Sequence, residues 1–284
     1  MRMNQNNLIL VPLLAFALVA LTVAESRAFY ESIGAKSIGM GGAFRALADD
    51  NSAIFFNPAG LTQNKKYSIG SGYTLLRANS KNFNYLSSSI VDTKTGPMGA
   101  GIAYIYKQKY RDPDDPTQAP GQVQEVAVAL AQEYIKSFHL GFTTHYLWGK
   151  PQKGWRLDAA ALFIPSQYII FGVIGKNLVE LEGDSREVDF GLASRLGDYV
   201  NLDFDLLWLP KAKTDNLGYN MGIELVAQKE FFLRGGYSFD RSHQDWYGVG
   251  MGWRFPRGSF DYGFRREVGG SDLIGHWVEI TVSI

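Results

Sequence analysis

The stretch 138-FHLGFTTHYLW-148 decides the fold, because two kinds of side chain alternate along its eleven positions. Mostly large and apolar residues stand at positions 138, 140, 142, 144, 146 and 148, and histidine, glycine or threonine stands at 139, 141, 143 and 145. A period of two places successive side chains on opposite faces of a β-strand. The sequence therefore predicts a strand with one apolar face and one small or polar face.

The same period dominates the chain after Lys66, with little sign of the 3.6-residue period of helices. Further alternating segments are Lys66–Arg77, Met98–Tyr106, Leu202–Trp208 and Tyr247–Trp253. A soluble β-sandwich alternates in the same way, so the composition of the polar face has to separate the two folds. That face combines charged residues with neighbouring glycines and alanines, which is typical of the inner wall of a membrane β-barrel.

The number of strands and the lengths of their connections favour the barrel independently. Fourteen strands are predicted in the sequence, each close to the ~9–11 residues that cross a bilayer at a tilt. Their predicted ranges are 66–78, 82–92, 97–108, 122–134, 136–148, 154–164, 167–177, 186–196, 199–209, 217–227, 230–239, 244–254, 258–266 and 275–284. Connections after even-numbered strands are mostly tight and those after odd-numbered strands are often longer, as in outer-membrane barrels. The predicted fold class is all-β, a closed antiparallel transmembrane β-barrel.

The beginning of the chain is typical of an export signal. Arg2 supplies a positive start, Leu8–Ala24 is an apolar run, and Ser26-Arg27-Ala28 fits a small-x-small cleavage site. The alternative is a membrane anchor, although a spanning helix needs about 20 apolar residues. We expect a signal peptide over residues 1–28, followed by an N-terminal segment over 29–65 and the barrel over 66–284.

The overall composition excludes several classes of function. The chain has 31 Gly, 15 Tyr, 18 Phe and 6 Trp, no Cys and a formal net charge of zero. A neutral chain does not favour a nucleic-acid partner, and the lack of Cys excludes disulfide scaffolds and thiolate metal sites. No P-loop or Gly-x-Ser-x-Gly motif occurs, and the four histidines have no metal-binding spacing. We expect no enzyme, no catalytic or metal-binding residue and no cofactor.

A glycine-rich segment, Ser37–Leu61, precedes the first predicted strand. Fourteen strands enclose a lumen too wide for wall side chains to fill, since about eight strands already give a filled interior. A compact plug, or hatch, inside the barrel would explain the composition of this segment. We expect a short helix over Ala43–Ala48, and a turn at Asn57-Pro58 because the residue before proline avoids helix. The acidic pair Asp49-Asp50 is compatible with a Ca²⁺ ligand or with a helix cap.

The segment Gly34–Leu61, with GAKSIGMGGAFRALADD followed by NPAGL, resembles the N-terminal signature of FadL-type outer-membrane long-chain fatty-acid transporters. It also resembles their relatives, the PorV/PorQ-like barrels. The resemblance implies a hatch inside a fourteen-stranded barrel in the outer membrane of a Gram-negative-type bacterium. The hatch residues that it implies as ligand contacts are Ile38, Gly39, Met40, Gly41, Gly42, Phe44, Phe55, Phe56, Asn57, Pro58 and Ala59. Most predicted outer loops are shorter than in the fatty-acid transporters, which weakens long-chain fatty acid as the substrate.

Charged residues on the predicted inner face allow two interpretations. These lumen charges are Glu125, Arg156, Asp158, Asp203, Asp205, Glu224, Arg234 and Arg254. They could line a permeation path, or they could pair across neighbouring strands and stabilise the wall, as Glu224 with Arg234. Because the two signs are nearly balanced, we favour pairing and expect no strong ion selectivity.

Three functions remain open at this point. The first is passive uptake of a small, long-chain fatty acid-like hydrophobic molecule, through a moving hatch and a lateral opening of the wall. The second, favoured by the short loops, is a PorV-like barrel that shuttles or anchors a secreted or surface protein. The third is a porin-like leak for polar solutes. We expect a monomer surrounded by outer-membrane lipid, with a hydrophobic molecule or a secreted protein as its partner.

Overall fold

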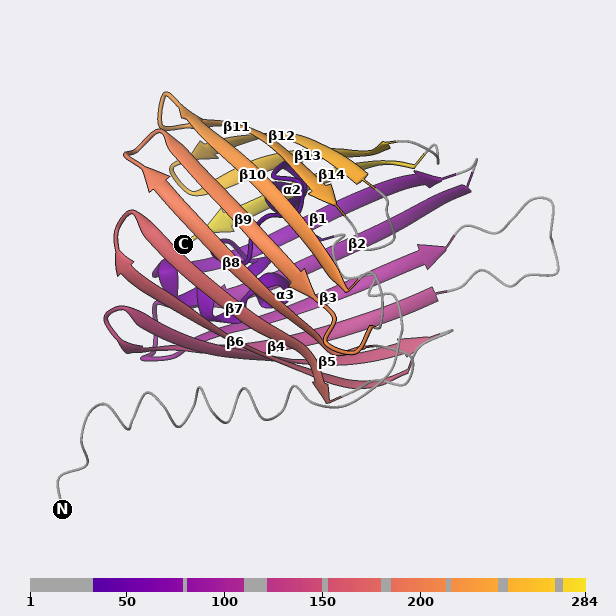
Figure 1. Ribbon diagram of the computed structural model, residues 1–284, viewed down its shortest axis with the longest axis horizontal. Coiled ribbons are helices and arrows are strands. Elements are labelled where there is room, and N and C mark those ends of the chain that lie inside the picture. The colour runs from indigo at the N-terminus through magenta and orange to yellow at the C-terminus, as the bar shows by residue number, and fades with distance from the viewer. Residues whose placement is uncertain are drawn as a thin grey trace, which may run out of the picture.

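The computed structural model describes residues 33–78, 81–109, 122–149, 153–179, 185–212, 216–239, 245–268 and 273–284. Its wall is a closed barrel of fourteen antiparallel strands, in which each strand pairs with its neighbours in chain order and β1 pairs with β14 (Figure 1). The strands are β1 Tyr67–Ala78, β2 Lys81–Asp92, β3 Gly99–Lys109, β4 Gln122–Ile135, β5 Phe138–Gly149, β6 Gly154–Ser166, β7 Ile169–Val179, β8 Glu187–Leu196, β9 Val200–Trp208, β10 Leu217–Ala227, β11 Phe231–Phe239, β12 Asp245–Phe255, β13 Gly258–Val268 and β14 Ile274–Ser283.

The predicted fold class is confirmed, and no predicted strand end differs from the observed one by more than two residues, as at 97 against Gly99. The accuracy follows from the period of two, which is uninterrupted along most strands. On β12 the side chains of Tyr247, Val249, Met251 and Trp253 are exposed outside, and the positions between them face inward. The outer surface is therefore apolar along the middle of the wall.

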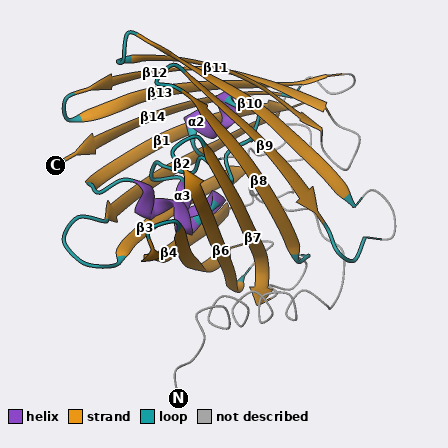
Figure 2. Cartoon of the chain, turned by 60° about the vertical axis from the view of Figure 1, so that its left-hand side comes forward, coloured by secondary structure: helices purple, strands orange, loops and turns teal. Residues whose placement is uncertain are grey.

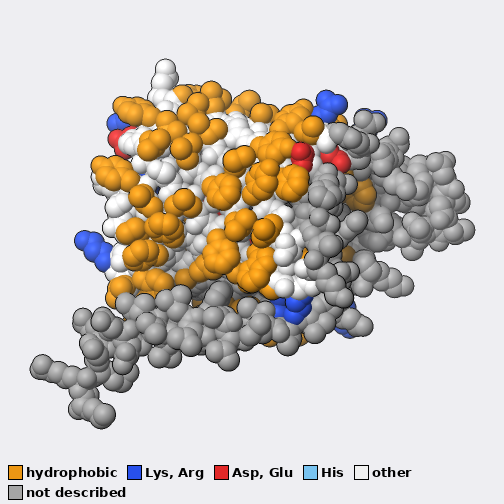
Figure 3. Space-filling model, viewed as in Figure 1, with side chains coloured by type: hydrophobic (Ala, Val, Ile, Leu, Met, Phe, Trp, Pro, Cys, Tyr) orange, Lys and Arg blue, Asp and Glu red, His pale blue; other side chains and the backbone are white. Residues whose placement is uncertain are grey.

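Figure 3 shows this outer surface directly. Hydrophobic side chains cover most of the described face over the strands, and the visible Lys, Arg, Asp and Glu side chains lie near its edges. An apolar band between polar rims matches the hydrocarbon core of a bilayer between its headgroups. The barrel is therefore a transmembrane one. Among the described residues, no helix is long and apolar enough to cross a membrane.

The wall departs from regular pairing most strongly in β7, where the sequence pattern is blurred. Leu157 on β6 pairs with Val179, but Ala159 pairs with Gly175, so β7 carries a bulge. Asn177 has a φ of 56° in this bulge. As a result Lys176 and Asn177 are both buried although they are consecutive residues.

Three short helices lie inside the ring of strands (Figures 1 and 2). They are α2 (Ala35–Gly39), α3 (Ala53–Phe56) and the 3-10 helix η1 (Pro58–Gln63). Asn57 is extended, with φ −165° and ψ 97°, and its side chain accepts a hydrogen bond from the Ala59 N–H. The predicted turn at Asn57-Pro58 is therefore present, and the proline starts η1.

The helix expected over Ala43–Ala48 is wrong, because this stretch forms turns. Some of its backbone N–H groups donate to carboxylates of the wall, as Phe44 does to Asp205 at 2.8 Å. Of the acidic pair before α3, Asp50 accepts a hydrogen bond from the Ser52 N–H at 2.8 Å. Ser52 is the N-cap residue of α3, and α3 has no side-chain cap hydrogen bond, so Asp50 holds the turn before the helix and does not cap it.

The outer face predicts a depth-dependent response to charge. Val249, at the middle of β12, is 47% exposed, and Leu196, at the end of β8, is 53% exposed. We expect Val249→Arg to cost about 2–4 kcal/mol of folding free energy in lipid and Leu196→Arg about 0–1 kcal/mol, because the bilayer centre is least tolerant of charge. Urea titration of the barrel folded in vesicles measures both, and equal losses would contradict the orientation of the wall.

Candidate functional site

The interior of the barrel is occupied by the N-terminal segment, and we call its described residues 33–65 the hatch. Glycines on the inner wall make room for the hatch backbone. A Cβ atom added at Gly222 would lie 2.6 Å from the Met40 carbonyl oxygen, and one added at Gly172 would lie 2.6 Å from the Arg45 carbonyl oxygen. In the described chain, the wall glycines whose nearest such contact is hatch backbone are Gly141, Gly172, Gly191, Gly222, Gly236, Gly248, Gly250 and Gly263.

These glycines change the meaning of the small residues on the polar face. Much of the space for close backbone approach is supplied by the wall, in addition to the glycines of the hatch itself. Of the hatch glycines, Gly41 and Gly42 have positive φ values of 66° and 85°, which favour glycine. The alternation of large residues with glycine along β10 to β13 could therefore have indicated, from the sequence alone, that a backbone segment packs against the inner wall.

Most apolar side chains of the hatch belong to one buried cluster that they share with the wall. Phe44 and Phe56 meet edge to face with ring centroids 5.6 Å apart, and Phe55 is only 6% exposed. The wall side chains of this cluster are Val91, Ala103, Ile105, Ala127, Ala129, Ala131, Ala160, Leu162, Ile170, Ile174 and Ala193. Hatch and wall thus share a continuous apolar core on the side of strands β2 to β8.

The structure buries all eleven hatch residues that the resemblance names. It does not bring them together into one site. Met40, Phe44, Phe55 and Phe56 belong to the cluster just described, whereas Ile38 packs in a second cluster with Leu76, Tyr85 and Trp277. These eleven hatch residues are thus covered by other parts of the described chain, and none of them offers an open apolar surface to a ligand.

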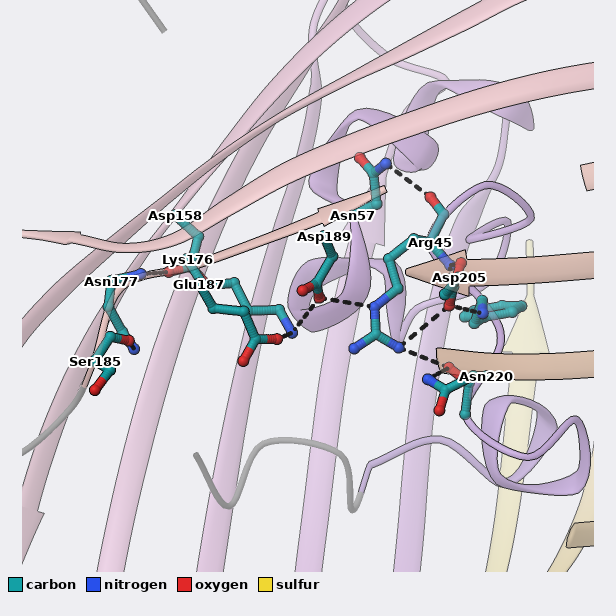
Figure 4. Close-up of polar contacts among 12 residues, drawn as sticks. Arg45, Asn57, Asp158, Lys176, Asn177, Ser185, Glu187, Asp189, Asp205 and Asn220 are labelled. Atoms are coloured by element: carbon teal, nitrogen blue, oxygen red, sulfur yellow. Dashed lines mark hydrogen bonds and ion pairs between the residues drawn. The ribbon is translucent and has the colours of Figure 1, made fainter. Parts of the chain in front are cut away.

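A fully buried arginine fixes the hatch to strands β8 and β9 of the wall (Figure 4). Its Nε donates to Asp189 at 3.0 Å, and its Nη1 lies 3.3 Å from Asp205 and donates to the Gly42 carbonyl at 2.7 Å. This residue, Arg45, also lies over the Phe56 ring at 5.3 Å. Its carbonyl accepts from the Asn57 side chain at 2.8 Å. The Arg45 side chain thus joins two wall strands and the turn after α2, and its backbone carbonyl joins them to the start of η1.

The carboxylates around Arg45 also receive backbone donors from the hatch. Asp205 accepts from the Phe44 N–H at 2.8 Å, and Asp203 accepts from the Leu47 N–H at 3.2 Å. On the other side Lys176, from the β7 bulge, lies 2.8 Å from Asp189 and 3.1 Å from Glu187. Charge-assisted bonds of this kind are about twice as strong as neutral ones.

A second polar cluster lies beside Phe55, on strands β4 to β6. His145 is fully buried, with Nδ1 2.8 Å from Glu125 and Nε2 3.2 Å from Asp158. Arg156 reaches Glu125 at 3.1 Å. The His145 and Phe55 rings are 5.9 Å apart, so this cluster borders the apolar core. In the described residues no group of His, Asp or Glu is arranged to hold a metal ion.

A third cluster surrounds Lys36 at the start of the hatch. Its Nζ lies 2.8 Å from Asp49 and 3.7 Å from Glu224. Glu224 in turn accepts from Arg234 at 2.7 Å, which is the cross-strand pair expected from the sequence. Burial raises the pKa of Asp49, but the Lys36 ammonium beside it, together with Lys66 and Arg195, outweighs burial and lowers the pKa from 3.8 to about 2.

Of the eight charged residues predicted to face the lumen, seven are buried and one is exposed. Seven of them are buried at 6% exposure or less, namely Glu125, Arg156, Asp158, Asp203, Asp205, Glu224 and Arg234. The eighth, Arg254, is exposed near the end of β12 and lies over the Phe232 ring at 4.7 Å. The buried ones contact charged or hatch partners rather than an open channel. Arg45, Lys36 and Lys176 were missed as their partners, because hatch and wall are far apart in sequence.

These features define a transmembrane β-barrel of fourteen strands whose lumen is filled by its own N-terminal segment. No protein-family profile matches the sequence. No curated protein matches it either.

Solved structures of known barrels share this fold. The toluene transporter TbuX of Ralstonia pickettii has a TM-score of 0.69 and 10% identity, covering 90% of this chain and 98% of that chain. The monoaromatic hydrocarbon channel CymD has a TM-score of 0.70 and 12% identity, with 91% and 99% covered. A Pseudomonas aeruginosa FadL homologue has a TM-score of 0.57 and 11% identity, with 87% and 97% covered. The chain therefore has the fold of FadL-type transporters, as the resemblance of Gly34–Leu61 implied.

The wall glycines predict a face-specific effect of a single methyl group. A Cβ at Gly236 would overlap the backbone of Met40 and Gly41, whereas one at the neighbouring Gly235 would lie 3.8 Å from Ile223 Cγ2, an ordinary van der Waals contact. We expect Gly236→Ala to unseat the hatch and Gly235→Ala to leave it in place. Conductance of the purified barrel in planar bilayers should rise for the first variant only. Equal conductance of the two variants would contradict this seat.

The Lys36–Asp49 pair predicts an acid-sensitive contribution to stability. Because the folded pKa of Asp49 is depressed to about 2, its contribution is complete above the ordinary pKa of 3.8 and is lost as the pH falls toward 2. We expect the difference in unfolding midpoint between the wild type and Asp49→Asn to be constant above about pH 5 and to shrink below pH 4. A difference that is unchanged down to pH 2 would show that Lys36 does not stabilise this carboxylate.

Proposed function

We propose that this protein is an outer-membrane barrel for the passive uptake of small hydrophobic molecules. The observation that carries the proposal is the apolar core shared by hatch and wall, which includes Phe44, Phe55 and Phe56. A hydrophobic molecule that enters this core exchanges one set of apolar contacts for another, at little cost. A polar solute would lose its hydration there without gaining partners.

The solved structures with the same fold support the chemical class of the substrate. Two of them are named for toluene or monoaromatic hydrocarbons, and a third is a FadL homologue. Those names describe those proteins, and at this low identity they are extended here only as a proposal. We therefore include both a monoaromatic hydrocarbon and a long-chain fatty acid as candidate substrates. The outer-membrane location belongs to the same proposal.

A lateral exit is the second part of the proposal. A groove of about 110 Å³ lies on the outer wall and is lined by Met98, Leu130, Ala131, Gln132, Tyr134, Leu140 and Phe142. Ala131 also belongs to the apolar core around the hatch, and the β4 register shifts between Glu133 and Ile135. The wall is thus thin and irregular where the core approaches lipid. Opening at this place would release an apolar molecule into the bilayer and spare it the paired charges elsewhere in the lumen.

We further propose that the barrel acts as a monomer surrounded by lipid. Since β1 pairs with β14, the sheet has no unpaired edge to offer a second copy. The paired charges and the buried hatch also argue against a general leak for polar solutes.

The test compares a gene-deletion strain with the same strain carrying the wild-type gene or Gly235→Ala, which serves as a neutral control. Initial uptake rates of labelled toluene and of labelled oleate are measured at low concentration. We expect deletion to lower uptake of at least one probe, and both complementing genes to restore it. Unchanged uptake of both probes after deletion would refute the proposal.

The burial of the hatch side chains also supports a second candidate, a barrel that shuttles or anchors a secreted or surface protein. The described candidate contact residues of the hatch are buried and form no open site for a hydrophobic molecule. A shuttle or anchor needs no such site. Comparing the surface proteins of the deletion strain and the wild type separates the candidates. Loss of a surface protein together with unchanged uptake would establish the shuttle in place of the transporter.

A further inference from the structure

We infer that helix α3 (Ala53–Phe56) is a flap that swings away from the wall to admit the hydrophobic molecule, while residues 35–48 stay fixed as an anchor. The inference rests on the proposed uptake function and assigns the moving part within the hatch. It follows from a difference in how the two parts are held. The anchor is held by charges and by backbone contact, and α3 is held mainly by apolar side chains.

The anchor is tied to the wall by buried ionic contacts. Arg45 bridges Asp189 and Asp205 at 3.0 and 3.3 Å, with no exposed surface on any of the three side chains. Lys36 adds Glu224 at 3.7 Å. Breaking one buried ion pair leaves an uncompensated charge in a dry interior, which is strongly destabilising. Movement of this part would break several such contacts at once.

Backbone packing holds the anchor as well. The Met40 and Gly41 backbone lies against Gly236, and the Ile38 carbonyl lies against Gly248. At each of these places the wall leaves too little room even for a methyl group. A segment fitted this closely cannot slide along the wall without separating from it. The anchor therefore defines the fixed frame against which any other part of the hatch moves.

Helix α3 is held differently. Its backbone is bonded to the wall by the hydrogen bond from Thr143 Oγ1 to the Ile54 carbonyl, at 2.8 Å, between two uncharged groups. A neutral bond of this kind adds only modestly to stability. Its side chains Ile54, Phe55 and Phe56 lie in the apolar core. An apolar ligand can replace those contacts, so the net cost of moving α3 is small when a ligand is present.

Two asparagines mark the ends of the flap. Before α3, Asn51 bonds Ser68 at 2.7 Å and Ser89 at 3.0 Å on the wall. After it, Asn57 donates to the Arg45 carbonyl at 2.8 Å and accepts from the Ala59 N–H. The chain is thus held on both sides of a five-residue span, Ser52 to Phe56. This span can rotate away from the wall as a unit. The adjacent η1 stays seated, because the Ala59 backbone lies against Gly141.

The direct test locks the flap with a disulfide, which the cysteine-free chain makes unambiguous. A Cβ at Gly101 would lie 3.0 Å from Ile54 Cγ1, the place that the sulfur of a cysteine at 54 would take, so cysteines at 54 and 101 are close enough to be joined. The double variant Ile54→Cys, Gly101→Cys is assayed for toluene uptake after oxidation and after reduction. The two single variants and the wild type, treated identically, are the controls.

We expect oxidation to lower uptake by the double variant to the level of the deletion strain, and reduction to restore it. Uptake by the oxidised double variant equal to that of its reduced form would overturn the flap, whereas absence of uptake by the wild type would overturn the proposed function itself. The two failures are therefore distinguishable in one experiment.

A second measurement does not depend on the tolerance of Gly101 to substitution. Ala46, in the anchor, and Ala53, in the flap, are both 0% exposed. Each is replaced by Cys in a separate variant, and the rate of labelling by a small maleimide is measured with and without toluene. We expect toluene to raise the labelling rate of Ala53→Cys about tenfold and to leave Ala46→Cys unchanged, as for a ligand that favours the open state. Equal responses at both positions would overturn the division into anchor and flap.

Discussion

A guanidinium group shielded from water has to be matched by carboxylates, and the seating of the hatch depends on this requirement at Arg45. Asp189 and Asp205 lie on adjacent strands, β8 and β9, so the arginine fixes the hatch to the wall and the two strands to each other. Asp205 also accepts hydrogen bonds from the backbone N–H groups of Phe44 and Arg45. The carboxylate that pairs with Arg45 thus also holds the adjacent hatch backbone.

Closure of the barrel explains why such a network can exist. A fourteen-stranded wall encloses more space than its own side chains fill, and the wall glycines widen it further where the hatch lies. The hatch closes this space with its backbone, and its donors then need acceptors from the wall. The carboxylates of β8 and β9 meet that need at Phe44, Arg45 and Leu47. Charged residues in the lumen therefore serve the hatch first, and ion selectivity does not follow from their number.

The fold was predictable from the sequence, because the pattern that specifies a strand is local. Tyr247 to Trp253 alternates visibly, and neighbouring strands follow one another in the chain. The seat of the hatch was not predictable in the same way, because Arg45 and Asp205 are 160 positions apart and no local pattern relates them. The bulge at Lys176 and Asn177 breaks the period of two, so no alternating pattern marked either residue as facing inward. The wall glycines were visible in the sequence, but they were interpreted only as part of a small and polar inner face and not as the contact surface of the hatch.

The two sides of the hatch divide stability and movement between different kinds of contact. A buried charge that moves away from its partner has no substitute partner in a dry interior, so separating the pair is strongly destabilising. Apolar contacts are non-directional, and any molecule of similar polarity can restore them. A barrel that has to remain closed without ligand and open for a hydrophobe therefore needs both kinds, on separate parts of the hatch. Arg45 with its aspartates and Phe55 with its alanine-rich wall have this arrangement, and the uncharged Asn57 connects them.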